Sequence, residues 1–122
     1  AQPNPIVLSG DFHMAMVNEV RAEPRDRRRP PAAVELMTPS LTSDFFRFYT
    51  PDSPQRFEAA LPANPQVQWS ANERGYLITT LHPDHLTAEY RFVDDVTDPE
   101  SPVRSAETFT IEAGSRRADR TR

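Results

Sequence analysis

The stretch LTAEYRFV, residues 86–93, decides the fold, because apolar and polar side chains alternate along it from Leu86 to Phe92. Leu86, Ala88, Tyr90 and Phe92 fall on one face, and the threonine, glutamate and arginine between them fall on the other. Successive side chains of a β-strand point to opposite faces. The period of two therefore predicts a strand with one buried face, and its neighbours can be worked out from it.

The second half of the chain predicts an antiparallel meander of about three strands plus a fourth. Residues 82–85, HPDH, form a four-residue turn with proline at its second position. Residues 72–75, NERG, predict a hairpin loop with Gly75 available for a positive φ. Residues 94–105 predict a long acidic loop. We expect the strands at residues 66–69, 76–81, 86–93 and 108–112.

The first half predicts shorter elements, separated by proline-rich loops. PIVL at 5–8 is a continuous apolar run, which suits a strand buried on both faces. Residues 14–20 predict a short helix or a looping segment, 21–31 a solvated loop, and 34–37 a strand. Short helices are expected at 44–49 and 54–61, the second with Pro54 in its first turn behind Ser53 as cap.

Composition sets the class of protein. The chain has 122 residues, of which 26% are charged and 37% apolar, as in a modest globular unit. A net charge of −4 indicates a chain not built as a whole for nucleic acid or anionic membranes. The absence of cysteine excludes disulfide frameworks and thiolate metal sites. No apolar run approaches the length that spans a bilayer.

The main candidate for chemistry is GDFH, residues 10–13, which follows the first apolar run. If the strand continues, Asp11 and His13 lie two residues apart on the same side of the backbone, and a carboxylate and an imidazole so placed can share a cation. Gly10 would let the backbone turn closely. The alternative is an ordinary strand-to-loop turn in which Asp11 caps the residues that follow. Spacing alone leaves both interpretations open.

Residues 6–13 resemble the C-terminal metal motif of the PhoD-like alkaline phosphatase D family of metallophosphatases, in which an apolar strand ends in a Gly-Asp-x-His turn. The similarity continues in order along the chain. Residues 34–43 resemble the family's strand and Ser-x-Thr-Ser turn, and 74–77 with 86–93 resemble its hairpin. Residues 103–114 resemble its closing strand. Met14 departs from the pattern, since the family more often has a small polar residue there.

The resemblance implies an α+β fold: the C-terminal portion of a calcineurin-like β-sandwich over residues 1–114, mainly antiparallel with short helices, and a flexible Arg-rich tail over 115–122. It implies hydrolysis of phosphate esters with iron and calcium as cofactors. Asp11 would be a metal ligand, and His13 a ligand or a catalytic contact to the phosphate. The chain itself leaves localisation unknown, and the resemblance implies a periplasmic or secreted protein.

Other motifs of the family are missing from this chain, which has one Gly-Asp and no Gly-Asn. A site of two or three metals needs more ligands than Asp11 and His13 provide. We therefore expect a fragment of a phosphatase or phosphodiesterase that is inactive alone. A phospholipase D-like diesterase is a rival within the enzyme class. The alternative outside it is a small β-rich binding or structural module without catalysis.

Five further groups have both a functional and a plain structural interpretation, and we favour the structural one. His82 and His85 could pair on a metal, but Pro83-Asp84 between them favours a turn. Three acids in the loop at 94–98 lack the glycine and the spaced glutamate of an EF-hand. The arginines of 25–29 favour a surface loop, and the hydroxyls of 40–43 a polar turn. The aromatic residues at 69, 76, 90 and 92 favour a core position over a stacking platform.

The strand at residues 5–8 would leave unpaired edges if its usual sheet partners are missing. We expect oligomerisation (self-association through exposed strand edges), edge pairing, or disorder at this end.

Overall fold

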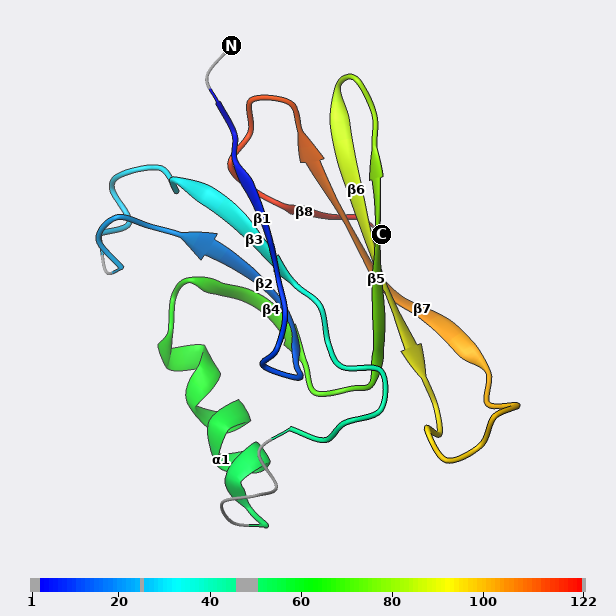
Figure 1. The fold of residues 1–122 in the computed structure, drawn as a ribbon. Helices are drawn as coiled ribbons and strands as arrows, with labels where there is room; N and C mark the ends of the chain where they lie inside the picture. The colour runs from blue at the N-terminus through cyan, green and yellow to red at the C-terminus, as the bar shows by residue number, and fades with distance from the viewer. Residues whose placement is uncertain (1–2, 25, 46–50, 122) are drawn as a thin grey trace.

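The computed structural model describes residues 3–24, 26–45 and 51–121, which form two four-stranded β-sheets and one short α-helix (Figure 1). The first sheet contains β1 (Ile6–Ser9), β2 (Ala15–Val20), β3 (Ala33–Met37) and β4 (Val67–Ala71). The second contains β5 (Gly75–Leu81), β6 (His85–Val93), β7 (Val103–Glu112) and β8 (Asp119–Thr121). The helix α1 (Ser53–Ala60) continues into a single 3₁₀ turn, Leu61–Ala63.

The first sheet has the order β1-β3-β2-β4, and β1 is the strand that runs parallel to its neighbour. Ile6 lies opposite Val34 and Ser9 opposite Met37, so the expected N-terminal strand is present and paired along one edge. It is not buried on both faces as expected, because Val7 is 42% and Leu8 61% exposed. β2 pairs antiparallel with both β3 and β4, with an irregularity between Val17 and Asn18 on the β4 side. Of the alternatives expected for this end, disorder does not apply to residues 6–9, which form a paired strand.

The prediction of a helix or looping segment at residues 14–20 is also wrong, because this segment is β2. Ala15 and Val17 face the core between the sheets, whereas Met14 and Met16 face a second core on the opposite side of the sheet. A strand that is buried on both faces has a continuous apolar sequence without alternation. A short run of this kind does not distinguish a strand from a buried helix.

The second sheet is the expected meander, in the order β5-β6-β7-β8 with every pair antiparallel. The amide of His82 donates to the carbonyl of His85 over 2.8 Å and closes the β5–β6 turn. Residues 119–121, expected in a tail, form β8 and pair with residues 108–110 of β7.

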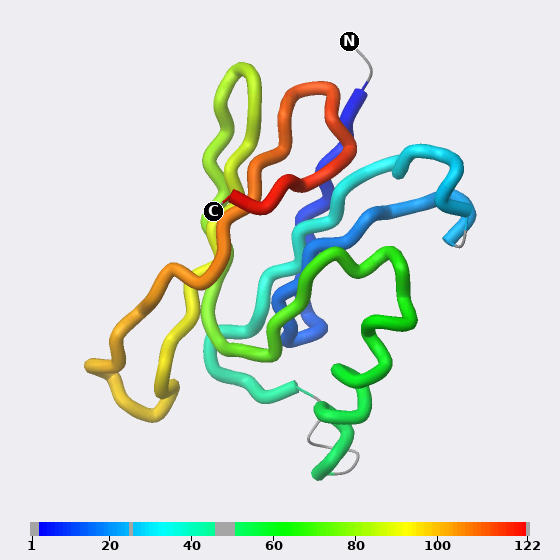
Figure 2. The backbone as a smooth tube through the Cα atoms, turned by 180° about the vertical axis from the view of Figure 1, so that it is seen from behind, coloured from blue at the N-terminus to red at the C-terminus, as the bar shows by residue number. Residues whose placement is uncertain are grey.

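The loop at 72–75 does not form the expected hairpin, because β4 and β5 belong to different sheets. The chain crosses here from one sheet to the other, and the crossing is visible from both sides of the molecule (Figures 1 and 2). The backbone amide of Gly75 donates to Ser40 (2.9 Å), and that of Val93 donates to Arg74 (2.9 Å). These two bonds attach the crossing to the loop after β3 and to β6.

The main core lies between the sheets. The buried face of β6 packs with Phe109 and Ile111 of β7 against four residues of the first sheet: Ala15, Val17, Val34 and Leu36. The Trp69 ring stacks on Phe92 and lies tilted against Tyr90 and Phe109. Across the core, the Tyr90 hydroxyl donates to the Met16 carbonyl over 2.9 Å. The interpretation of Trp69, Tyr90 and Phe92 as core residues is confirmed, whereas Tyr76, also expected in the core, belongs to neither core cluster.

A second core lies on the other face of the first sheet, beneath α1. Phe57 and Leu61 pack there with Met14, Met16 and Phe45. The helix has Asp52, and not Ser53, at its N-cap, and Pro54 lies in the first turn as expected. Of the helix expected at 44–49, residues 44 and 45 are not helical, and 46–49 lie outside the described residues. No helix in the described part of the chain could cross a membrane.

Candidate functional site

The turn that follows β1 carries both predicted site residues, but its geometry differs from a continued strand. Asp11 (φ 71°) and His13 (φ 61°) both have left-handed backbone conformations. The expectation that alternation along a strand places them side by side is therefore wrong. Gly10 lets the turn lie close to the loop after β3 because it has no side chain: a Cβ there would lie 3.3 Å from the Thr38 methyl. The Thr38 amide donates to the Ser9 carbonyl (2.9 Å), which holds the two segments together.

Two left-handed residues other than glycine within one short turn are unusual. Aspartate and histidine tolerate this region better than most residues, yet each such position still costs about 1–3 kcal/mol unless the surroundings hold it. Strained residues of this kind cluster at active sites and ligand-binding sites. The backbone therefore gives an independent reason to treat Asp11 and His13 as functional candidates.

The imidazole of His13 is held by a backbone group. Its Nδ1 lies 2.9 Å from the carbonyl oxygen of Asp44. A carbonyl can only accept, so Nδ1 carries the proton and donates. In the neutral ring, Nε2 then has the lone pair. Metal-binding histidines in proteins are held in the same way, with the second ring nitrogen donating to a carbonyl or carboxylate.

The side chain of Asp11 is exposed. Together, Asp11 and His13 offer one carboxylate and one imidazole, a donor set that suits iron and other borderline divalent ions and, through the carboxylate alone, calcium. Among the residues that the structure describes, no group of three or more His, Asp or Glu side chains is placed to hold a metal ion. The donors fit a share of a metal centre, and they do not complete one.

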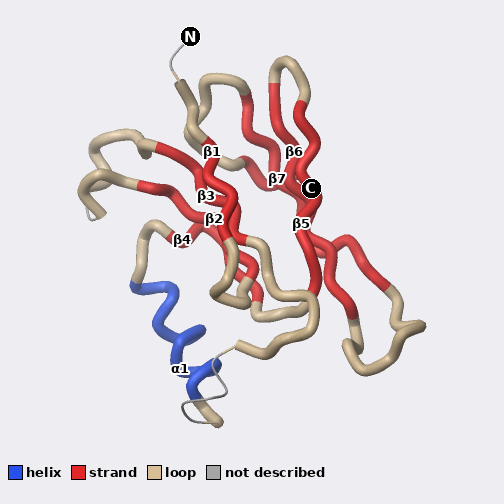
Figure 3. The backbone as a smooth tube through the Cα atoms, in the orientation of Figure 1, coloured by secondary structure: helices blue, strands red, loops and turns tan. Residues whose placement is uncertain are grey.

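The loop after β3 lies beside this turn and reaches the foot of β5 before it turns back toward α1 (Figure 3). The Ser40 hydroxyl donates to the Ser43 carbonyl within the loop, as expected of a polar turn. The Arg74 guanidinium donates to the same Ser43 carbonyl through Nη1 (2.6 Å). Asn72 donates in turn to Glu58 of α1 over 2.7 Å. The loop that bears the Asp44 carbonyl is thus fixed from the crossing at 72–75.

Three phenylalanine rings, from the turn, the loop and α1, contact one another, and we call Phe12, Phe45 and Phe57 the aromatic cluster. Their centroids lie 5.1, 5.4 and 5.2 Å apart, and each pair meets edge to face. This cluster has no signal in the sequence, because its members are far apart in the chain and follow no local period. Met14, which departs from the family pattern, is fully buried in the core beneath this cluster.

A cleft of about 520 Å³ opens beside the Asp44 backbone. Polar and apolar groups from the loop, the start of α1 and the crossing line it among the described residues: Asp44, Phe45, Pro51, Pro54, Gln55, Asn72 and Arg74.

The rings of His82 and His85 are stacked, with centroids 4.3 Å apart and planes 13° apart. A metal ion lies near the plane of each imidazole that binds it, and two nearly parallel stacked planes do not share such a point. His85 Nδ1 also pairs with Asp84 (2.7 Å), and this hydrogen bond lowers the pKa of the Asp84 carboxyl. The pair belongs to the β5–β6 turn, as expected.

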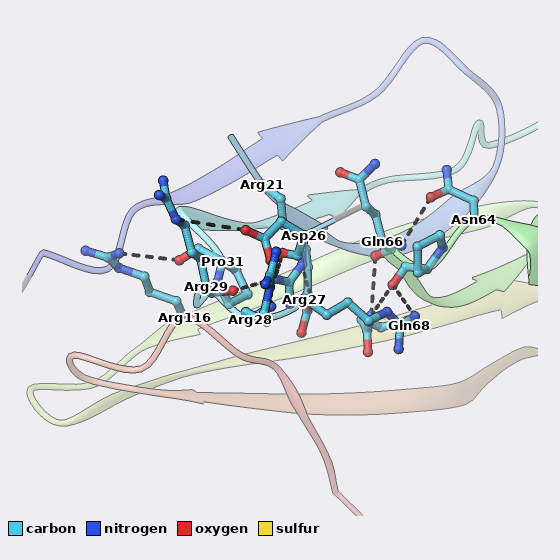
Figure 4. Close-up of polar contacts among 12 residues, drawn as sticks. Arg21, Asp26, Arg27, Arg28, Arg29, Pro31, Asn64, Gln66, Gln68 and Arg116 are labelled. Atoms are coloured by element: carbon cyan, nitrogen blue, oxygen red, sulfur yellow. Dashed lines mark hydrogen bonds and ion pairs between the residues drawn. The ribbon is translucent and has the colours of Figure 1, made fainter. Parts of the chain in front are cut away.

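The acidic loop and the arginine loop also have structural roles. In the first, Asp95 accepts from the amide and hydroxyl of Thr97, and Asp98 accepts from the Glu100 amide. In the second, shown in Figure 4, Asp26 pairs with Arg28 and Arg29. Arg21, whose side chain is largely buried, donates to the Asp26 and Arg29 carbonyls and pairs with Glu19. Surface loops account for both segments over the residues that the structure describes, and Arg25, expected in the same cluster, lies outside them.

Comparison with known proteins places this chain in a family. The family model for PhoD-like phosphatases matches residues 1–90. Alkaline phosphatase D from Bacillus subtilis (strain 168) is 25% identical over 109 residues, which cover 89% of this chain and 18% of that protein. A solved structure described as "Structure of PhoD" superposes with a TM-score of 0.67 at 20% identity, over 93% of this chain and 22% of that one. The chain thus spans about a fifth of the length of these relatives. It belongs to the PhoD-like phosphatase family.

Proposed function

We propose that this chain is the part of a metal-dependent phosphate ester hydrolase that contributes Asp11 and His13 to the metal centre. The observation that carries the proposal is the bond from His13 Nδ1 to the Asp44 carbonyl, which fixes the ring with its Nε2 lone pair available to a ligand. The left-handed conformations of both residues add support.

Iron and calcium are the ions proposed, on the ground of the family resemblance. When bound, such ions polarise the phosphoryl oxygens and lower the pKa of a coordinated water. With a neutral ring, His13 would offer Nε2 to the ion. With a protonated ring, it would instead donate a hydrogen bond to the phosphate. Asp11 would offer its exposed carboxylate as an anionic ligand, which partly neutralises the charge of the centre.

We further propose that the chain is inactive alone, since the described residues provide two ligands where a site of two or three ions needs more. Hydrolysis of p-nitrophenyl phosphate by the purified chain, with iron and calcium added, tests this. We expect no turnover above that of the metals alone. Clear turnover that Asp11→Asn abolishes would overturn the claim.

The metal role has its own test, which uses Mn²⁺ as a probe. Bound Mn²⁺ changes the relaxation rate of water protons, so a titration measures even weak binding. We expect binding by the wild-type chain to fall by at least tenfold in Asp11→Asn and in His13→Gln. His82→Gln is the matched control, because the stacked pair at 82 and 85 should contribute nothing. Equal binding by all four proteins would contradict the proposal.

One observation favours the alternative function, a β-rich binding module. The core between the two sheets is closed and well buried within this chain, as a self-sufficient module requires. A chain that folds cooperatively, binds no Mn²⁺ at residues 11–13 and hydrolyses no ester would support that alternative. The calcineurin-like sandwich and the hydrolysis of phosphate monoesters or diesters are part of the phosphatase proposal, on the ground of the family resemblance.

A further inference from the structure

The Asp44 carbonyl can orient His13 only if the loop that bears it is held in place. Asp44 is exposed and lies in an irregular segment outside the described strands and helices. Phe45, the next residue, is 3% exposed and buried in the aromatic cluster. The burial of the Phe45 ring, together with the hydrogen bond from Arg74 to the Ser43 carbonyl, anchors the backbone at the position that His13 contacts.

The same cluster holds the other partner of the hydrogen bond. Phe12 lies between Asp11 and His13 in the strained turn, and its ring meets those of Phe45 and Phe57 at centroid distances of 5.1 and 5.4 Å. Edge-to-face pairs of this kind contribute roughly 0.5–1.5 kcal/mol each beyond their buried area. Such contacts can offset the backbone strain of the turn.

The third ring comes from α1. This helix has eight residues, and helices of that length are marginal in water without tertiary contacts. Phe57 and the succeeding Leu61 attach it to the second core. The hydrogen bond from Asn72 to Glu58 attaches it to the crossing loop as well. Phe57 is thus the residue through which a separate element closes the aromatic cluster.

We propose that Phe57 and Phe45 are positioning residues for His13, which keep its ring in the form protonated at Nδ1 by holding the Asp44 carbonyl against the turn. The value of this arrangement to a metal centre rests on the proposed function. The arrangement itself does not, because the tautomer of His13 is a property of the metal-free chain.

The experiment measures the two ring ¹⁵N chemical shifts of His13 in the metal-free chain at a pH where the ring is neutral. In the wild type we expect two widely separated shifts, with the proton on Nδ1. In Phe57→Ala we expect the shifts to converge, as the ring exchanges between both tautomers. Phe57→Tyr keeps the ring and should restore the wild-type separation. Tyr76→Ala removes a half-buried ring from β5 and should leave His13 unchanged.

A folded Phe57→Ala chain with wild-type His13 shifts would overturn the proposal. If that variant does not fold, Phe57→Leu replaces it, since leucine keeps much of the apolar volume but not the edge-to-face contacts. Unchanged shifts in folded Phe57→Leu would overturn the proposal equally. Mn²⁺ binding separates the two claims: loss of the Nδ1 tautomer in a chain that never binds Mn²⁺ supports positioning by Phe57 but contradicts the proposed function.

Discussion

Replacing Gly75 by alanine should be the most damaging of the glycine substitutions, because this residue lies where the chain passes between the sheets. A Cβ at position 75 would lie 2.0 Å from the Arg91 carbonyl oxygen and 2.9 Å from the Phe92 Cα. A carbon and an oxygen approach normally to about 3.3 Å. The backbones of β5 and β6 must therefore separate by roughly 1 Å, and neither atom belongs to a flexible side chain.

The expected loss of stability can be estimated from the overpacking and from the hydrogen bonds that this separation lengthens. Overpacking costs about 1–3 kcal/mol. Two backbone hydrogen bonds of 2.9 Å, from Gly75 to Ser40 and from Val93 to Arg74, would lengthen, at about 1 kcal/mol each. The expected loss is about 3–5 kcal/mol, a large part of the 5–15 kcal/mol that stabilises a typical domain.

Urea unfolding followed by fluorescence measures this loss, because the single tryptophan, Trp69, lies in the core between the sheets. At a slope of about 2 kcal/mol per molar urea, the midpoint should fall by at least about 1.5 M. Gly10→Ala is the first control, since the inserted Cβ meets only a methyl group of Thr38 at 3.3 Å. Gly114→Ala meets no atom within 4 Å and should lose about 1–2 kcal/mol through its φ of +84°. A Gly75→Ala midpoint equal to that of Gly10→Ala would refute the reasoning.

Two other predictions concern the core and the edge of the first sheet. Tyr90→Phe removes the hydrogen bond to Met16 and should destabilise the chain by about 1 kcal/mol near neutral pH. Burial raises the pKa of Tyr90 above its ordinary value of 10.0, so above pH 10 the unfolded chain releases this proton while the folded chain retains it. Above pH 10 the free energy of unfolding of the wild type then falls by about 1.4 kcal/mol per pH unit, whereas that of Tyr90→Phe does not. The urea midpoints of the two proteins should therefore cross near pH 11. A constant difference between the two midpoints from pH 8 to 11 would contradict this prediction. On β1, Leu8 is 61% exposed, and we propose that this strand self-associates through its free edge. Light scattering at increasing concentration should show dimers that Leu8→Lys removes, and a monomer at every concentration would contradict the proposal.

The alternation of residues 86–93 predicted β6 correctly because it reports a local fact, namely that one face of the strand is buried. The segment at 14–20 has no such signal. Its two faces meet different cores, one shared with the second sheet and one with α1, and the first of these requires partners that are up to about 95 residues away in the chain. The sequence pattern therefore leaves a buried strand and a helix indistinguishable.

The candidate site shows the same division. Asp11 and His13 could be named from the Gly-Asp-x-His pattern, and the family they imply is confirmed. The left-handed conformations, the Asp44 carbonyl and the aromatic cluster could not be predicted, because they depend on contacts between the turn, the loop after β3 and α1. The loop at 72–75 was misassigned for a related reason: its glycine is needed for close approach to β6 and not for a hairpin turn.

The most direct test of the central claim is the location of bound Mn²⁺ on the chain, measured residue by residue. The ion broadens the amide signals of nearby residues, so spectra with increasing Mn²⁺ show where it resides. We predict that the amides of residues 10–13 broaden first, and that His13→Gln abolishes the selective broadening. Broadening that begins instead at the acidic loop, residues 94–98, or is spread evenly over the acidic surface, would contradict the assignment of Asp11 and His13 to a metal centre.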